Sequence, residues 1–144
     1  MPPNKIKMKS SDDSTLYYRH HTAMVTRIRL RGSWVSGQHQ ELMITLDSDI
    51  LIRISRNNGE DTLQFGAVEQ RTSASPMITL GESIIPRGVT CRHVLQAFSE
   101  AHKAYPNWEH ADCQVFAQNI YRKLDPNRAI AVLGAEIEEE DDFM

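Results

Sequence analysis

Cys113 is the residue of this chain whose chemistry depends most on its position. It follows Asp112 and opens a run in which apolar or small residues recur with helical spacing, at Phe116, Ala117, Ile120 and Leu124. The pattern predicts an amphipathic helix with Cys113 in its first turn and Asp112 as N-cap, because a carboxylate there can accept from the free first-turn amides. The positive end of a helix favours the thiolate, which is the nucleophilic form of cysteine.

A cysteine on an apolar stripe can also be a packing residue. Free cysteine is among the most buried residue types and behaves as a small hydrophobe, so position alone favours packing over reactivity. The second cysteine, Cys91, lies on the apolar side of another predicted helix, which Thr90 caps and which extends to about Ala104. We interpret Cys91 as a core residue.

Two runs of sequence favour a reactive Cys113. Residues 105–120, YPNWEHADCQVFAQNI, follow a predicted helix over 89–104, and residues 38–46, QHQELMITL, place a histidine at the start of a predicted strand. These runs resemble the permuted papain-like thiol hydrolases, the group that includes the PPPDE desumoylating isopeptidases, the lecithin:retinol acyltransferase-like enzymes and the bacterial NlpC-type peptidases. The resemblance covers about residues 34–125, with His before Cys as in that group.

The resemblance implies roles for particular residues. Cys113 would attack a carbonyl, His39 would be the general base, and Asn57 or Glu41 would orient the imidazole. Backbone amides near the helix start would stabilise the oxyanion. The candidates for substrate binding are Trp108, Gln114 and Trp34.

One residue departs from the family pattern. Asp112 stands where the first two of those groups have Asn, and its negative charge disfavours a neighbouring thiolate and opposes the effect of the helix end. The third catalytic residue is also left open, because Arg53 or Ser55 stands where retinol-acyltransferase-like proteins commonly place a second His.

The strands that must position His39 can be placed by alternation. Residues 39–46 and 50–56 predict a hairpin with its aliphatic side chains on one core face, at Leu42, Ile44, Leu46, Ile50, Ile52 and Ile54. A three-residue turn at 47–49 keeps these side chains together, whereas a two-residue turn would split them. The opposite face would carry His39, Glu41 and Arg53, with His39 across from Asn57.

Strand patterns precede helix patterns along the chain. Residues 24–31 predict a strand with an arginine-bearing solvent face, and 62–69 and 77–85 predict two more strands. The order indicates an α+β domain in which an antiparallel sheet packs against a helix pair, in agreement with the permuted papain-like fold that the resemblance implies. We expect a disordered lead over 1–14, one domain over 15–134 and a solvated acidic tail over 135–144.

Charge and hydropathy restrict the function classes. The chain has 144 residues and a net charge of −3, but six of its nineteen acidic residues lie in 136–142, and residues 15–135 carry 13 basic and 11 acidic side chains. That balance gives no indication of a nucleic-acid surface. No stretch approaches a membrane span, and the N-terminus lacks a secretory pattern, so we expect a cytoplasmic protein. No glycine-rich phosphate loop is present, and we expect no cofactor and no metal.

Three function classes follow. The first is a cysteine-dependent hydrolase or acyl transferase that acts on an amide, isopeptide or ester bond of a protein or peptide substrate, such as a ubiquitin-like or acyl-bearing partner. The alternative is a catalytically inactive relative that binds a protein partner. The third is a zinc site built from Cys91, His93, His110 and Cys113. Its spacing is poor, because the side chains of a Cys-x-His pair within one helix point about 200° apart.

Overall fold

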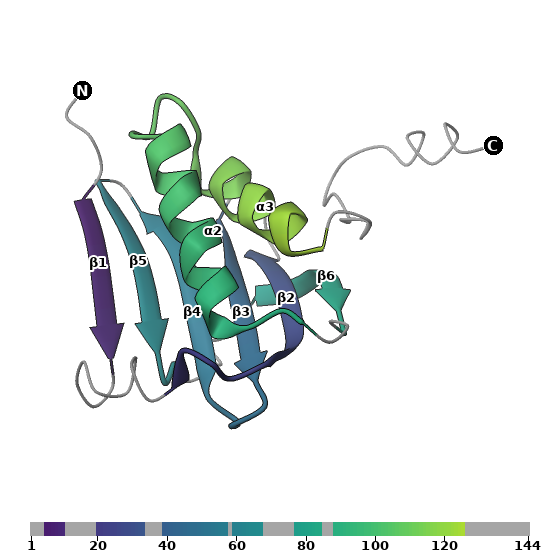
Figure 1. Cartoon of the computed structure of the whole chain (residues 1–144). Helices are drawn as coiled ribbons and strands as arrows, with labels where there is room; N and C mark the ends of the chain where they lie inside the picture. Colours follow the sequence, from purple (N-terminus) through teal and green to yellow (C-terminus); the bar gives the residue numbers. More distant parts are fainter. Residues whose placement is uncertain are drawn as a thin grey trace.

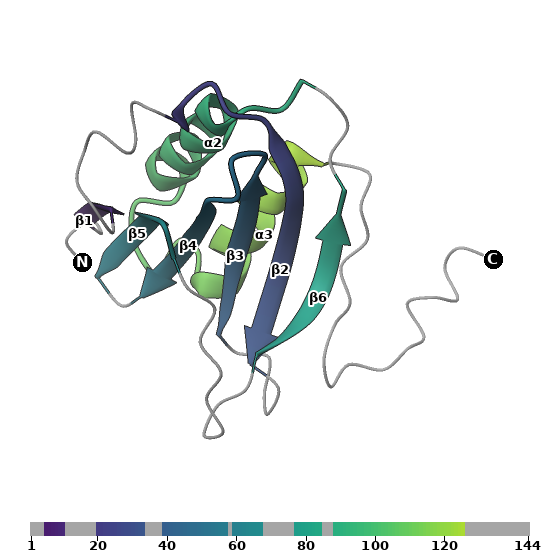
Figure 2. The same cartoon turned by 90° about the horizontal axis from the view of Figure 1, so that it is seen from below.

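The computed structural model describes residues 5–10, 20–33, 39–57, 59–67, 77–84 and 88–125. These residues form a six-stranded sheet and two helices (Figure 1). In chain order the elements are β1 (Lys5–Ser10), β2 (Val25–Ser33), β3 (Gln40–Leu46), β4 (Leu51–Asn57), β5 (Glu60–Phe65), β6 (Met77–Ser83), α2 (Cys91–Ala104) and α3 (Cys113–Leu124). The strands lie in the order β1-β5-β4-β3-β2-β6, and Figure 2 shows both helices on the same face of the sheet. The fold is α+β, as the order of patterns predicted.

The β3–β4 hairpin has the register that the alternating sequence predicted. Ile44 pairs with Ile52, and the amide N–H of Leu46 donates to the carbonyl oxygen of Ile50 at 3.0 Å. The turn therefore consists of residues 47–49, and its last residue, an aspartate, has a φ of 68°, a conformation that Asp tolerates better than most residues. The hairpin presents one aliphatic face to the helices and one polar face away from them.

The first strand contradicts the prediction of a disordered lead over 1–14 for residues 5–10, and the rest of that lead lies outside the described residues. Lys5–Ser10 forms β1, which pairs with β5 in parallel, from Lys5 opposite Glu60 to Ser10 opposite Phe65. The sheet is therefore mixed rather than wholly antiparallel. The prediction was wrong because polar, lysine-rich composition does not prevent a short edge strand, whose backbone is satisfied by its neighbour. The predicted acidic tail lies outside the described residues.

β2 does not expose its arginines as the sequence predicted. Arg29 and Arg31 are only 9% and 7% exposed, whereas Arg27 is more exposed and forms an ion pair with Glu82 of β6. The register with β3 shifts next to Val25, so that this residue, 3% exposed, joins the core although the simple alternation placed it with the arginines. A bulge of this kind adds a residue to one strand and thereby breaks its alternation.

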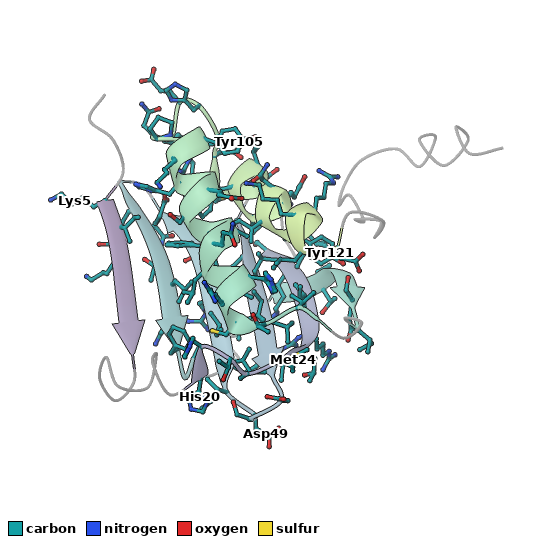
Figure 3. All side chains as sticks on the ribbon, viewed as in Figure 1. Lys5, His20, Met24, Asp49, Tyr105 and Tyr121 are labelled. Atoms are coloured by element: carbon teal, nitrogen blue, oxygen red, sulfur yellow. The ribbon has the colours of Figure 1, made fainter. Side chains whose placement is uncertain are left out.

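Both helices match the predicted boundaries and cover the aliphatic face of the hairpin. Thr90 is the N-cap of α2, and the rings of Phe98 and Phe116 meet edge to face with centroids 6.0 Å apart. Tyr121 of α3 is fully buried near β6 (Figure 3), and its hydroxyl lies 3.1 Å from the Ser83 hydroxyl. Each aliphatic side chain buried at this interface stabilises the fold by roughly 2 kcal/mol relative to an exposed one.

In the part of the chain that the structure describes, neither helix has the length and apolar character needed to cross a membrane.

Candidate active site

Cys113 is the first residue of α3 and lies in the predicted helix-start arrangement. The Asp112 carboxylate accepts hydrogen bonds from the amides of Gln114 at 3.1 Å and Val115 at 3.0 Å, which fixes the beginning of the helix. Cys113 is 5% exposed. Its thiol therefore belongs to the edge of the core and still borders an open cavity.

His39 lies just before β3, and its side chain is 39% exposed. Its Nε2 atom is 3.7 Å from the Glu41 carboxylate, which is on the same face of the hairpin two residues further along. The other oxygen of Glu41 is 3.6 Å from Nε of Arg53, the neighbour of Met43 on β4. A partly exposed imidazole is thus backed by the carboxylate of a residue that is 8% exposed.

The structure brings His39 and Cys113 together across the end of the sheet. The hydrogen bond between their side chains is the largest reason why the pKa of His39 is raised to about 9. The contact with Glu41 raises this pKa further, as do the negative charges of both partners, while partial burial opposes the shift. At neutral pH His39 is therefore an imidazolium that faces a sulfur atom and a carboxylate.

The predicted site residues divide into those at the cavity and those elsewhere. A cavity of about 450 Å³ adjoins the thiol and is lined by His39, Trp108, Asp112, Cys113 and Gln114. Two of the three predicted substrate-binding residues, Trp108 and Gln114, are therefore at the thiol, while Trp34 lies outside the described residues. Of the two candidates for the third member, Glu41 contacts His39. Asn57 is exposed at the end of β4, in register with Glu60.

Sequence reasoning missed a buried arginine beneath this site. Arg56 of β4 is 0% exposed and forms a two-pronged ion pair with Asp61 of β5, with Nε–Oδ1 and Nη2–Oδ2 distances of 2.7 and 2.8 Å. Its guanidinium also donates to three backbone carbonyls of the connection between α2 and α3. These are the carbonyls of Tyr105, of Asn107 at 3.2 Å and of Ala111 at 2.8 Å.

The same guanidinium contacts α3 directly, and it is linked to α2 through Asp61. Its Cζ atom is 4.3 Å from the centre of the Phe116 ring, one turn after Cys113, and the Asp61 carboxylate it holds is 2.7 Å from Nδ1 of His102 in α2. Alternation could have located this cluster, since Arg56 shares the core face with Ile52 and Ile54. The start of α3 is therefore fastened to the β4–β5 hairpin by a buried charge.

The second cysteine is placed differently. Cys91 is the first residue of α2, is 0% exposed, and has its pKa raised to about 11 by burial. Both cysteines are free thiols. The 14 residues of α2 and the connection that follows them separate the two cysteines in the chain. Within the described ranges no group of three or more His, Cys, Asp or Glu side chains is arranged to hold a metal ion, and the proposed zinc set is not assembled.

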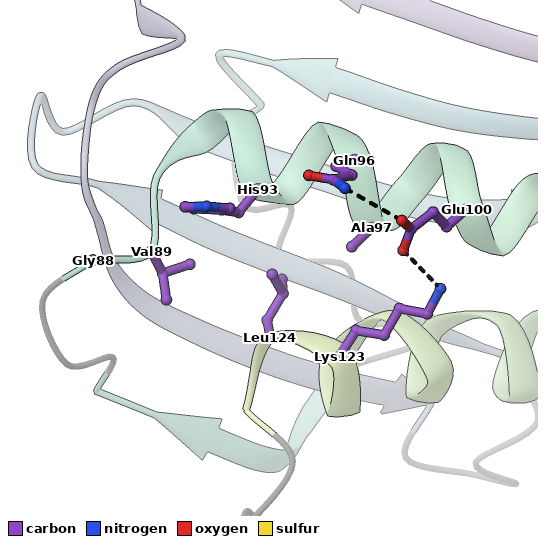
Figure 4. Close-up of a pocket in the computed structure, with 8 residues that line it drawn as sticks. All are labelled: Gly88, Val89, His93, Gln96, Ala97, Glu100, Lys123 and Leu124. Atoms are coloured by element: carbon purple, nitrogen blue, oxygen red, sulfur yellow. Dashed lines mark hydrogen bonds and ion pairs between the residues drawn. The ribbon is translucent and has the colours of Figure 1, made fainter.

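A second cavity, of about 390 Å³, lies between the start of α2 and the end of α3 (Figure 4). Glu100 bridges the two helices there, accepting from Gln96 at 3.3 Å and pairing with Lys123 at 3.2 Å. Its lining contains neither cysteine, and it consists of Gly88, Val89, His93, Gln96, Ala97, Glu100, Lys123 and Leu124. Of these two cavities, the thiol cavity is the one that brings a cysteine and a histidine together.

Comparisons of the chain with protein-family models, with curated proteins and with solved structures gave no match.

Proposed function

We propose that the chain is a cysteine-dependent hydrolase or acyl transferase that acts on an amide, isopeptide or ester bond, with Cys113 as nucleophile. The observation that carries this proposal is the hydrogen bond between Cys113 and His39, two residues 74 positions apart in the sequence, at an open cavity. A permuted papain-like arrangement is part of the same proposal. It is supported by the histidine at the start of a strand, the cysteine at the start of a later helix, and their contact.

The raised pKa of His39 changes the role expected of it in the first step. A histidine with a pKa of about 9 already carries its proton at neutral pH, so it stabilises the Cys113 thiolate as an ion pair instead of waiting to deprotonate a thiol. The thiolate then attacks the carbonyl carbon, and the imidazolium gives its proton to the leaving amine or alcohol. Neutral His39 is left to act as base for the water or acceptor that releases the acyl group from sulfur.

Glu41 is the residue best placed to orient the imidazole. Its carboxylate faces Nε2 of His39, so Nδ1 is the nitrogen left to exchange a proton with the sulfur. Nε of Arg53 lies 3.6 Å from the other oxygen of Glu41 and helps to keep the carboxylate in place. We therefore assign the third position to Glu41 and not to Asn57.

Two of the backbone amides at the helix start are already used within the helix cap. The amides of Gln114 and Val115 already donate to Asp112. The side-chain amide of Gln114 lies at the same cavity and carries N–H groups of the kind that stabilise an oxyanion. We propose that the Gln114 side chain supplies at least one of these donors.

The test is acylation by a small activated ester. With p-nitrophenyl acetate, thiolate attack forms an acetyl thioester and expels p-nitrophenolate, so nitrophenolate release and the mass gain of one acetyl group should coincide. The wild-type chain and Cys91→Ala should both be acetylated on Cys113. Cys113→Ala should abolish acetylation, and His39→Ala should slow it about 10²-fold, the usual contribution of a positioned proton carrier.

His93→Ala is the control, because His93 is a histidine in the first turn of the other helix and lines the other cavity, away from Cys113. It should leave the acetylation rate unchanged. Acetylation that persists in Cys113→Ala, or that is equally fast in His39→Ala and wild type, would contradict the proposal.

A protein-binding module without catalysis is the second candidate, and Asp112 is the observation that favours it. Its carboxylate occupies two first-turn amides and places a negative charge beside the thiol. An unacetylated but folded wild-type chain would select this candidate.

A further inference from the structure

Two of the side chains at the thiol cavity have no part in the acyl-transfer steps. Trp108, in the connection between α2 and α3, is 36% exposed, and Asp112 lines the same cavity at the start of α3. An indole beside a carboxylate is a combination that attracts cations, since the aromatic ring and the anion both stabilise a positive charge. The question is whether the charge of Asp112 is already cancelled within the site.

Asp112 is the carboxylate among the residues that line the cavity, and within the described part of the chain it forms no ion pair. In the proposed mechanism His39 and Cys113 form one neutral pair, and the Glu41 carboxylate has Nε of Arg53 at 3.6 Å, with Arg31 opposite Glu41 in the register of β2 and β3. The partners of Asp112 are two backbone amides, which carry no net charge. The helix end contributes about half a positive charge, which offsets only part of the carboxylate.

A second negative group lies in the same connection. Glu109 follows Trp108 directly and is exposed. It is screened by solvent more strongly than Asp112, so its effect is smaller and falls with salt. Both charges have the same sign, and both acidic residues follow Trp108 within four positions of the sequence.

We infer that the cavity binds a positively charged side chain of the lysine or arginine type next to the bond under attack. This rests on the proposed function only in taking Cys113 as the attacking group. Asp112 and Trp108 then select the substrate, while His39 and Glu41 serve the chemistry. The residue that departs from the family pattern, Asp112, becomes a specificity determinant.

Charged thiosulfonates test the inference without a known substrate. The thiolate attacks the sulfenyl sulfur of a methanethiosulfonate, a mixed disulfide forms and methanesulfinate leaves, so the same reaction can be run with a cationic trimethylammonium-ethyl, an anionic sulfonatoethyl or a neutral methyl reagent. The full chain carrying Cys91→Ala leaves Cys113 as its one cysteine. N-acetylcysteine amide at the same pH and salt is the reference thiol.

The cationic-to-anionic rate ratio should be about tenfold higher for Cys113 than for the reference thiol at low salt, and lower at high salt. Asp112→Asn should reduce that ratio about threefold or more while keeping the start of α3, because Asn is as good an N-cap as Asp. Trp108→Leu should slow the cationic reagent more than the neutral one. Asp125→Asn, the same change at the other end of α3, should leave the ratio unaltered.

The outcomes separate the two proposals. If Cys113 reacts readily with the neutral reagent but its charge ratio equals that of the reference thiol, the inference about substrate charge is overturned and the nucleophile stands. A ratio that is raised but unchanged by Asp112→Asn also overturns it. If Cys113 reacts more slowly than the reference thiol with all three reagents, the proposed function itself fails.

Discussion

Two cysteines occupy the same helical position in this molecule and have different surroundings. Cys91 opens α2 and Cys113 opens α3, and their exposures are 0% and 5%. Both thiols therefore lie where the positive end of a helix favours a negative charge. Around Cys91 burial raises the pKa to about 11, whereas Cys113 has a hydrogen bond with an imidazolium. The same helix position therefore has two different surroundings, and the neighbouring imidazole is what distinguishes Cys113 from Cys91.

The two helix starts differ in what holds them. The start of α2 packs into the core, and the amide of Cys91 donates to the carbonyl of Ala23 at 2.9 Å. The start of α3 is fastened from below by Arg56 through the carbonyl of Ala111 and faces a cavity on its other side. Cys91 is enclosed on all sides. Cys113 is held in place by the backbone beneath it and borders a cavity open to solvent.

The largest expected difference between the cysteines is in alkylation rate. At pH 7 a thiol with a pKa of about 11 is ionised to a fraction of about 10⁻⁴, and Cys91 must also be exposed by local opening before it can react. We expect iodoacetamide to modify Cys113 at least about 10³-fold faster than Cys91, as measured by mass spectrometry of the two peptides. Cys113→Ser should leave Cys91 as slow as before. Similar alkylation rates of Cys113 and Cys91 would show that the two thiols do not differ in reactivity.

Removing the buried guanidinium of Arg56 should affect Cys113 and not Cys91. Arg56→Met leaves Asp61 as a buried charge without its partner and deprives the connection of its donors, so the free energy of unfolding should fall by about 3 kcal/mol. Urea denaturation measures this change. In the folded fraction, alkylation of Cys113 should slow, whereas that of Cys91 should not.

Arg53→Met is the control on the same strand, since Arg53 is half-buried and has an ion pair of 3.6 Å. Its effect on the free energy of unfolding should stay below about 1 kcal/mol. Equal losses for the two variants would show that Arg56 is no more important to the fold than a partly exposed arginine.

The smallest expected effect concerns the carboxylate behind His39. Glu41→Gln removes the second-largest cause of the raised pKa, so a proton NMR titration should find the pKa of His39 lower than about 9 by about one unit. Because the folded-state pKa lies above the ordinary value of 6.5, the stability from these contacts is fully present below pH 6.5 and is lost as the pH rises through about 9. In Glu41→Gln the pKa of His39 is lower, so the remaining stability from its contacts should be lost at lower pH than in the wild type. Glu82→Gln, on the exposed edge strand, should leave the titration of His39 unchanged.

The sequence predicted the elements whose patterns are local. The N-cap at Asp112, the helix from Cys113 and the three-residue turn after Leu46 each follow from residues close together in the chain. The contact of His39 with Cys113 was implied by resemblance to a family and not by spacing, because no local pattern relates residues 74 positions apart.

The features that escaped prediction depend on distant partners. β1 is a strand because β5 offers it a parallel neighbour, and composition gave no sign of that neighbour. A bulge at Val25 changes the alternation of β2, and a bulge leaves little trace in side-chain pattern. Arg56 lies on the core face by parity, yet a charge at that position is stable only because Asp61 and three carbonyls surround it.

The attachment of the α2–α3 connection to Arg56 has a consequence for amide hydrogen exchange. Because a side chain of β4 holds the carbonyls of Tyr105 and Ala111, this connection cannot open locally without exposing the buried pair of Arg56 and Asp61 to solvent. Connections between helices usually belong to the least protected part of a protein, but this one should open together with the central strands. The thiol of Cys113 would then lie in a part of the molecule as rigid as the sheet beneath it.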